Sequence, residues 1–338
     1  QHLNIDIKKL NEKHLYAVLS DLDNLQEKIE HKWSIYNRKK TDKIYLYDIT
    51  SFYFEGTMNE LSAYGYDRDK KKGHKKIITA GLIADKEGFP LKIQVFKGNM
   101  LDYKTVQEQI KDLKELFEAT EIIFVGDRGM KLRYNLDEMV EADREGVKYI
   151  TGLTIDEIKG LVTEGIIQLS LFDNKLMEIE DDGKRYVLCV NPYLAKEKQQ
   201  KRAVKKIKFE TELAAVQKSY QKEKERCRKN RQRLTEGDKN KKLKVTLTDK
   251  EIDAWKYRIR KVQEKYKMQK VYKVTINRRG FCINYDAAYY EDLSKYDGKY
   301  VFETTVDKEA LSTEEVRQTY KRLQLVKHAF KDIKTCKL

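Results

Sequence analysis

The stretch KIYLYDITSFYF, residues 43–54, decides the fold of this chain. Its β-branched and aromatic residues are typical of a buried strand, and an acid, Asp48, stands in the middle of it. A second apolar stretch, EIIFVGD at residues 121–127, predicts another short strand that ends on Asp127. We expect these two strands to be neighbours near the centre of one sheet.

The segments around these two strands predict an α/β protein. KKIITAGLIAD (75–85) and FPLKIQVFKG (89–98) read as strands that form an antiparallel unit with the first. Residues 104–119 and 135–146 have helical spacing of apolar residues, and VKYITGL (147–153) predicts a further strand. This order predicts a mixed sheet flanked by helices.

The composition changes near residue 154. Hairpin strands are expected at 165–192, a long basic helix at 196–234 and a second helix at 251–269. Strand patterns return at 271–277, 280–290 and 299–306, and a single helix is expected at 313–334. We therefore predict four segments: an N-terminal helical segment (1–42), a first core part (43–153), a large α+β insertion (154–297), and a C-terminal strand with a helix (298–338).

The charge favours a polyanionic partner. The 338 residues include 70 Lys and Arg against 55 Asp and Glu, a net charge of +15. A solvated surface rich in lysine is the alternative explanation, and it applies most directly to the basic helix at 196–234. The four cysteines are widely spaced, which is typical of reduced thiols. No apolar run approaches the ~20 residues that a membrane helix needs, and the N-terminus has no signal-peptide pattern. A cytoplasmic protein is expected, and Gln1 as the first residue suggests a fragment.

Asp48 and Asp127 are the candidate metal ligands. A carboxylate within an apolar strand is costly unless a cation or a donor pairs with it. Two such aspartates on neighbouring strands could share Mg²⁺, with Mn²⁺ as a substitute, and such ions activate the attacking oxygen in phosphodiester chemistry. The alternative is that each aspartate caps a turn.

Several motifs in order resemble the transposases of bacterial insertion sequences, members of the DDE superfamily. They are YDITSFYFEG (47–56), the run from Ala63 to Asp102, IIFVGDRGM (122–130) and VKYITGL (147–153). The resemblance implies a ribonuclease-H-like core with an insertion before its last catalytic helix. It also implies that Asp48 and Asp127 are the first two members of a catalytic triad.

The third member in that family is a glutamate on the final helix, within a spaced Tyr-Arg-Glu-Lys signature. In this sequence the frame falls on Tyr320, Leu323, Lys327 and Lys334. A lysine therefore stands at the expected glutamate position. The resemblance implies that Tyr320 and Lys334 contact DNA phosphates, and Arg128, beside Asp127, is a further candidate for phosphate binding.

Two functions follow as hypotheses. The first is a DNA transposase, a metal-dependent endonuclease that cleaves and joins strands in DNA recombination. Its partner would be double-stranded DNA with terminal inverted repeats, bound by a dimer. The second is a degenerate transposase that binds DNA without cutting it, because Lys327 replaces an acid. A ribonuclease-H-like nuclease with cellular duties is a third reading, which the insertion and the C-terminal signature disfavour.

Overall fold

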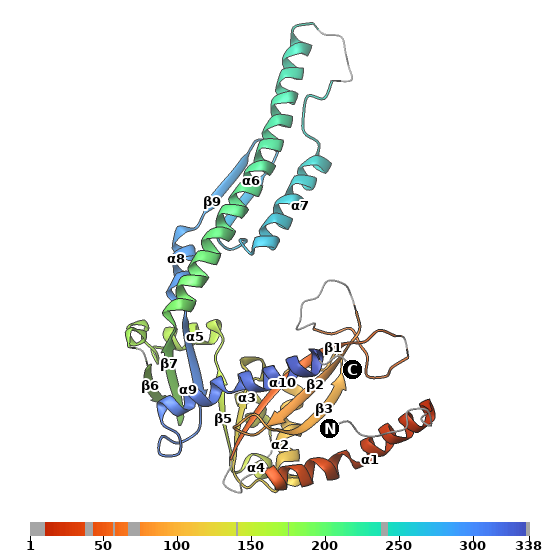
Figure 1. The fold of residues 1–338 in the computed structure, drawn as a ribbon. Coiled ribbons are helices and arrows are strands. Elements are labelled where there is room, and N and C mark those ends of the chain that lie inside the picture. Colours follow the sequence, from red (N-terminus) through yellow and green to blue (C-terminus); the bar gives the residue numbers. More distant parts are fainter. Residues whose placement is uncertain are drawn as a thin grey trace. The chain divides into compact units, whose positions relative to one another are not determined.

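The protein is described by a computed structural model covering residues 11–37, 43–56, 58–66, 75–139, 141–174, 176–237 and 243–335 (Figure 1). It divides into two compact units. The first unit comprises Gln1–Cys189 and Tyr300–Leu338, and the second unit comprises Val190–Lys299. Each unit has its own apolar core and is described separately.

A mixed sheet organises the first unit, with strand order β3-β2-β1-β4-β5-β10-β7-β6. β1 pairs antiparallel with β2 and parallel with β4, and β4 pairs parallel with β5. This mixed α/β arrangement was expected and is compatible with a ribonuclease-H-like fold. The strands are β1 (Ile44–Tyr53), β2 (Ile77–Ala84), β3 (Pro90–Lys97), β4 (Ile122–Gly126), β5 (Val147–Gly152), β6 (Leu176–Asp181), β7 (Lys184–Val190) and β10 (Lys299–Thr304).

Helices cover both faces of this sheet, which makes three layers. On one face, α2 (Val106–Glu115) and α3 (Leu132–Glu138) pack on the odd-numbered side chains of β1, such as Tyr45 and Tyr47. On the other face, α9 (Thr313–Lys321) and α10 (Leu323–Thr335) pack on Leu46. β1 is buried on both sides, which explains why its sequence is apolar almost throughout.

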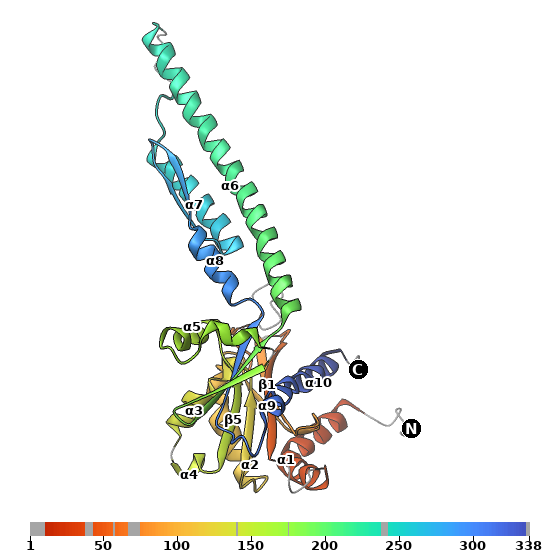
Figure 2. The same cartoon turned by 90° about the vertical axis from the view of Figure 1, so that its left-hand side faces the viewer.

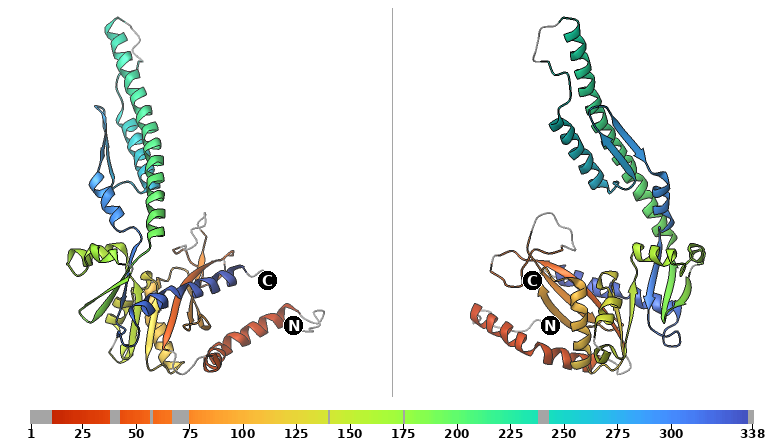
Figure 3. Two further views of the ribbon diagram at one scale, coloured as in Figure 1. Left: turned by 60° about the vertical axis from the view of Figure 1, so that its left-hand side comes forward. Right: turned by 180° about the vertical axis from the view of Figure 1, so that it is seen from behind.

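The remaining elements of the first unit are short, apart from one helix. α1 (Glu12–Asn37) lies along the β3 edge, where Trp33 Nε1 donates to the Pro90 carbonyl at 2.8 Å (Figure 3). The short elements are η2 (Asp102–Thr105), η3 (Arg128–Met130), α4 (Glu141–Arg144), α5 (Ile155–Thr163) and η4 (Leu169–Asp173). Of these, η2 and η3 border the site described below.

The second unit is built on one long helix. α6 (Pro192–Thr235) packs against α7 (Asp249–Tyr266), and beside them lie the hairpin of β8 (Tyr272–Ile276) and β9 (Phe281–Tyr285) and the helix α8 (Ala287–Lys295) (Figure 2). Its core includes Phe209, Tyr220 and Trp255. The tryptophan and Tyr220 meet edge to face, with ring centroids 5.6 Å apart.

The structure differs from the sequence-based expectation in four places. Residues 154–189 belong to the first unit, so the division falls at Val190 and not at residue 154. The strand expected at 280–290 ends at Tyr285, because Asp286 caps α8 by accepting from the Tyr289 amide. The helix expected at 135–146 is interrupted at Met139, which has extended backbone. The final helix is divided at Arg322.

Within the described residues, no helix combines the length and the apolar character needed to cross a membrane.

Candidate active site

Strand alternation places Asp48 and Asp127 on one face of the sheet. Tyr47 of β1 is in register with Gly126, the last residue of β4, and an aspartate with extended backbone follows each of them. Leu46 and Val125, two residues before these aspartates, both lie in the core under α10. Because side chains alternate along a strand, Asp48 and Asp127 project toward the same helix. The neighbouring arrangement that the apolar strands predict is therefore present.

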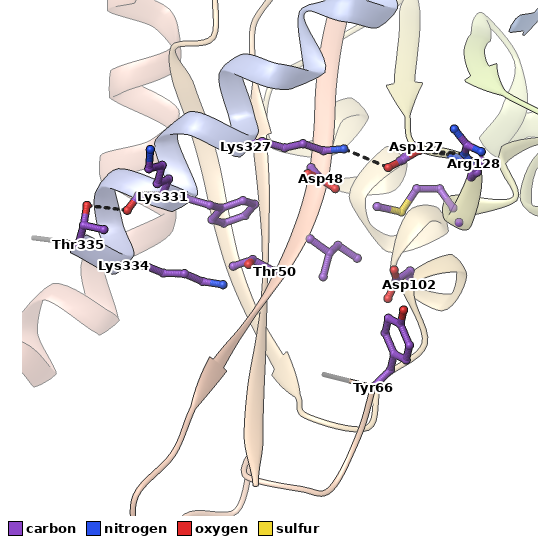
Figure 4. A pocket seen from close by; sticks show the side chains of 14 residues that line it. Asp48, Thr50, Tyr66, Asp102, Asp127, Arg128, Lys327, Lys331, Lys334 and Thr335 are labelled. Carbon is purple, nitrogen blue, oxygen red and sulfur yellow. Dashed lines mark hydrogen bonds and ion pairs between the residues drawn. The ribbon is translucent and has the colours of Figure 1, made fainter. Parts of the chain in front are cut away.

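The helix above them supplies Lys327. Leu323, Val326 and Phe330 form the buried face of α10, and Lys327 lies at the edge of that face. Its Nζ lies 3.1 Å from Asp127 Oδ2, and both aspartates line the same pocket as Lys327 (Figure 4). The lysine at the expected glutamate position therefore points into the site, although its side chain is 49% exposed.

Both carboxylate oxygens of Asp127 are engaged. Oδ1 accepts from the Arg128 amide at 2.8 Å and from the Tyr320 hydroxyl at 3.1 Å, while Oδ2 accepts from Lys327. Burial raises the pKa of Asp127, but the charge and hydrogen bond of Lys327 and the other two donors outweigh it, so the net pKa is lowered. The carboxylate form is therefore the stable one.

Lys327 interacts with both acids. Burial lowers the pKa of Lys327, but the charges of Asp48 and Asp127 raise it by more, so the net pKa is raised. Asp48 itself is 8% exposed, which places its charge in a largely desolvated position next to the ammonium group. The centre of the site is consequently two carboxylates and one ammonium ion.

These residues do not fit a two-metal site as they stand. Mg²⁺ needs oxygen ligands in near-octahedral geometry, and two ions need several carboxylates. Asp48 and Asp127 are two, and the ammonium group of Lys327 occupies Asp127 Oδ2. Among the described residues, no group of three or more His, Cys, Asp or Glu side chains could hold a metal ion. Lys327 supplies the positive charge that a bound cation would otherwise bring.

The pocket around this centre is open and carries basic groups. It has a volume of about 760 Å³. Two of the proposed DNA contacts, Arg128 and Lys334, line it, and Lys334 Nζ also lies 5.5 Å from the Phe52 ring centroid. Lys331, one turn after Lys327, lines it too. Four basic side chains thus surround a cavity that could accept a phosphate backbone.

Tyr320 packs in the core with its hydroxyl on Asp127, and its contact with DNA stays a prediction. Its ring packs on Phe302 at a centroid distance of 4.5 Å, and its hydroxyl donates to Asp127. Burial and the neighbouring charge of Asp127 raise its pKa. A Cβ added to Gly152 would lie 2.6 Å from the hydroxyl, so the absence of a side chain there makes room for Tyr320. In this structure the hydroxyl of Tyr320 positions Asp127.

Three ionisable residues of the pocket had little or no weight in the sequence analysis: Tyr66, Asp102 and Lys331. Asp102 is beside Tyr66, away from the pair of aspartates (Figure 4). Its position in GNMLD (98–102), after the third strand, is a weak signal for a site, and turn chemistry explains it nearly as well. Lys331 could have been found from its spacing, because it stands four residues after Lys327 on one helix.

Comparison with known proteins gives little support for any family or function. No family model matches the sequence, and no curated protein matches it. A solved structure with some similarity is the Mos1 transposase paired-end complex with the left transposon end, at 16% identity and a TM-score of 0.19. The match covers 40% of this chain and 44% of that chain, which is less than half of either. At this TM-score the likeness supports no conclusion about fold or function.

Proposed function

We propose that this chain is a transposase-like protein that binds double-stranded DNA at the pocket of the first unit and does not cut it. The observation that carries the proposal is the ion pair between Lys327 Nζ and Asp127 Oδ2, at 3.1 Å. An ammonium group has no lone pair for a metal ion and competes with it for the carboxylate. Cleavage that depends on two ions at Asp48 and Asp127 is therefore suppressed in this chain.

Two observations support DNA as the partner. The sequence motifs around Asp48 and Asp127 resemble those of insertion-sequence transposases, and four basic side chains line the pocket. Phosphate oxygens of a DNA backbone are bound by such groups with an affinity that falls as salt rises. From the resemblance to insertion-sequence transposases, we also propose that the bound DNA carries terminal inverted repeats and that the chain binds it as a dimer.

An active transposase is the second candidate function. The placement of Asp48 and Asp127 on neighbouring strands and one face favours it. The side chain of Lys327 is 49% exposed, so it has room to leave Asp127 when a cation or a phosphate arrives. In that case Mg²⁺ or Mn²⁺ would be needed for strand cleavage, and this requirement stays a prediction.

DNA binding by the full chain, measured by fluorescence anisotropy in EDTA and in Mg²⁺, tests the proposal. We expect binding in EDTA and no gain in affinity on adding Mg²⁺, because Lys327 already neutralises the site. The double variant Lys331→Gln and Lys334→Gln should weaken binding and reduce its salt dependence by about two phosphate contacts. Absence of binding, or binding that requires Mg²⁺, would contradict the proposal.

A further inference from the structure

The positive charge of the chain is concentrated in the second unit. Residues 190–299 contain 32 Lys and Arg against 15 Asp and Glu, a net charge of +17, whereas the whole chain carries +15. The rest of the chain is therefore slightly acidic. This concentration of positive charge indicates that the second unit has its own surface for a polyanionic partner.

One face of α6 carries basic residues in a row. Lys218, Lys222, Lys229 and Arg233 are all exposed, and we call them the basic stripe. At 100° per residue they fall within an arc of about 60°, and they extend over about 22 Å of helix. The buried side chains Leu213, Tyr220 and Cys227 lie on the opposite face of the same helix. The stripe therefore faces away from the core of the second unit.

These four residues differ from four other basic residues of the second unit. Lys201, Lys256, Lys261 and Arg278 each make an ion pair with a carboxylate. Among the described residues, none of the four stripe residues does so. Glu225 lies near their face and interacts with the charge of Lys229, but Arg228 binds both of its oxygens, at 2.8 and 2.9 Å. The four stripe residues therefore carry positive charge that no ion pair among the described residues neutralises.

A solvated helix gains nothing from such a pattern. Lys218 and Lys222, and then Lys229 and Arg233, are like-charge pairs at i and i+4, which destabilise a helix. Positions four residues apart on a helix are about 6 Å apart along its axis, so each pair places two positive charges close together, which suits a polyanion. A phosphate backbone offers the stripe residues acceptors at ion-pair distance, which the described carboxylates do not.

We propose that the basic stripe of α6 is a second DNA-binding surface, which contacts the sugar–phosphate backbone of duplex DNA without reading its sequence. The inference rests on the proposed function for the identity of the partner, but it concerns a surface other than the pocket of the first unit. Contacts of this kind position a duplex and contribute affinity that depends on salt but not on base sequence.

The test compares two variants of the full chain with the same change in charge. The stripe variant carries Lys218→Gln, Lys222→Gln, Lys229→Gln and Arg233→Gln. The control carries Lys201→Gln, Lys256→Gln, Lys261→Gln and Arg278→Gln, which removes three lysines and one arginine that are already paired. Circular dichroism of both verifies that they fold. Binding to duplexes of two unrelated sequences is measured across a range of salt concentrations.

The stripe variant should lower the slope of log affinity against log salt by about 3 to 4 for both duplexes, because each lost phosphate contact removes about 0.9. The control should change the slope by less than about 1. Equal slopes for the stripe variant and the unaltered chain would overturn the inference while leaving the pocket proposal intact. The same slopes are measured with a single-stranded RNA. A slope change by the stripe variant on this RNA but not on duplex DNA would also overturn the inference. No DNA binding by the unaltered chain would overturn both proposals.

Discussion

Replacing Lys327 by glutamate should make the stability of the protein depend on divalent metal. Lys327→Glu removes an ammonium group 3.1 Å from Asp127 Oδ2 and puts a third carboxylate beside two others. The side chains of Lys327 and Asp127 are 49% and 34% exposed, so solvent screens them and the lost attraction is about 0.2–1 kcal/mol. Repulsion of similar size replaces it. Without metal, the variant should be less stable by about 1–2 kcal/mol.

Metal should reverse this loss in the variant only. Three carboxylates can ligate Mg²⁺, and an ion present at about 100 times its Kd stabilises the folded state by about 2.7 kcal/mol. For domains of about this size, 1 kcal/mol corresponds to roughly 2–4 °C in Tm. We expect a loss of about 2–8 °C in EDTA and a rise of about 5–10 °C on adding Mg²⁺. The unaltered chain should change by less than about 1 °C, because Lys327 holds the site.

Thermal unfolding followed by circular dichroism, in EDTA and at several Mg²⁺ concentrations, measures these differences. Lys327→Met is the matched control, since it removes the ammonium group without adding a ligand. It should lose part of the stability and recover little of it with Mg²⁺. The reasoning is refuted if Mg²⁺ raises the Tm of the unaltered chain as much as that of Lys327→Glu.

Three further variants or conditions test the structure around the site. Phe330→Ala, at a side chain 4% exposed, should lower the free energy of unfolding in urea by about 3–5 kcal/mol. Leu325→Ala, at a side chain 38% exposed, should lower it by about 0.5 kcal/mol or less. Equal losses would contradict the orientation of α10 that buries Phe330. Tyr320→Phe removes a hydrogen bond to a carboxylate and should cost about 1.5–3 kcal/mol, and an unchanged unfolding free energy would show that the contact to Asp127 is absent. The stability difference between the chain and Lys327→Met should be constant near neutral pH. It should fall as pH drops through the lowered pKa of Asp127, below 3.8, and as pH rises through the raised pKa of Lys327, above 10.5; a difference that changes between about pH 5 and 9 would exclude this pair as its source.

The central strands could be predicted because their signal is local. The apolar runs around Asp48 and Asp127 predicted β1 and β4, and the parity of the side chains then fixed which face each aspartate takes. Lys327 entered the site through its spacing from Tyr320 and Lys334, which the resemblance provided. Its contact with Asp127 follows from the packing of α10 on this face.

Other features depend on contacts that sequence patterns do not carry. The final helix is divided at Arg322 without any Gly or Pro, so local propensity gives no sign of the break. The hydrogen bond from Tyr320 to Asp127 joins residues 193 positions apart. The strand expected through residue 290 failed because aromatic residues favour strands, whereas the cap at Asp286 starts a helix. The boundary near 190 depends on β6 and β7 joining the sheet next to β10, which is a non-local pairing.

The most direct measurement of the effect of Lys327 is strand cleavage of a supercoiled plasmid that carries the gene with its native genomic flanks. The unaltered chain, Lys327→Glu, and Lys327→Glu combined with Asp127→Asn are each incubated with the plasmid in Mg²⁺ and in Mn²⁺. We predict that the unaltered chain leaves the plasmid supercoiled, that Lys327→Glu nicks or linearises it, and that Asp127→Asn abolishes this gain. Cleavage by the unaltered chain at the rate of Lys327→Glu, and dependent on Asp127, would contradict the proposal that Lys327 suppresses the chemistry of this site.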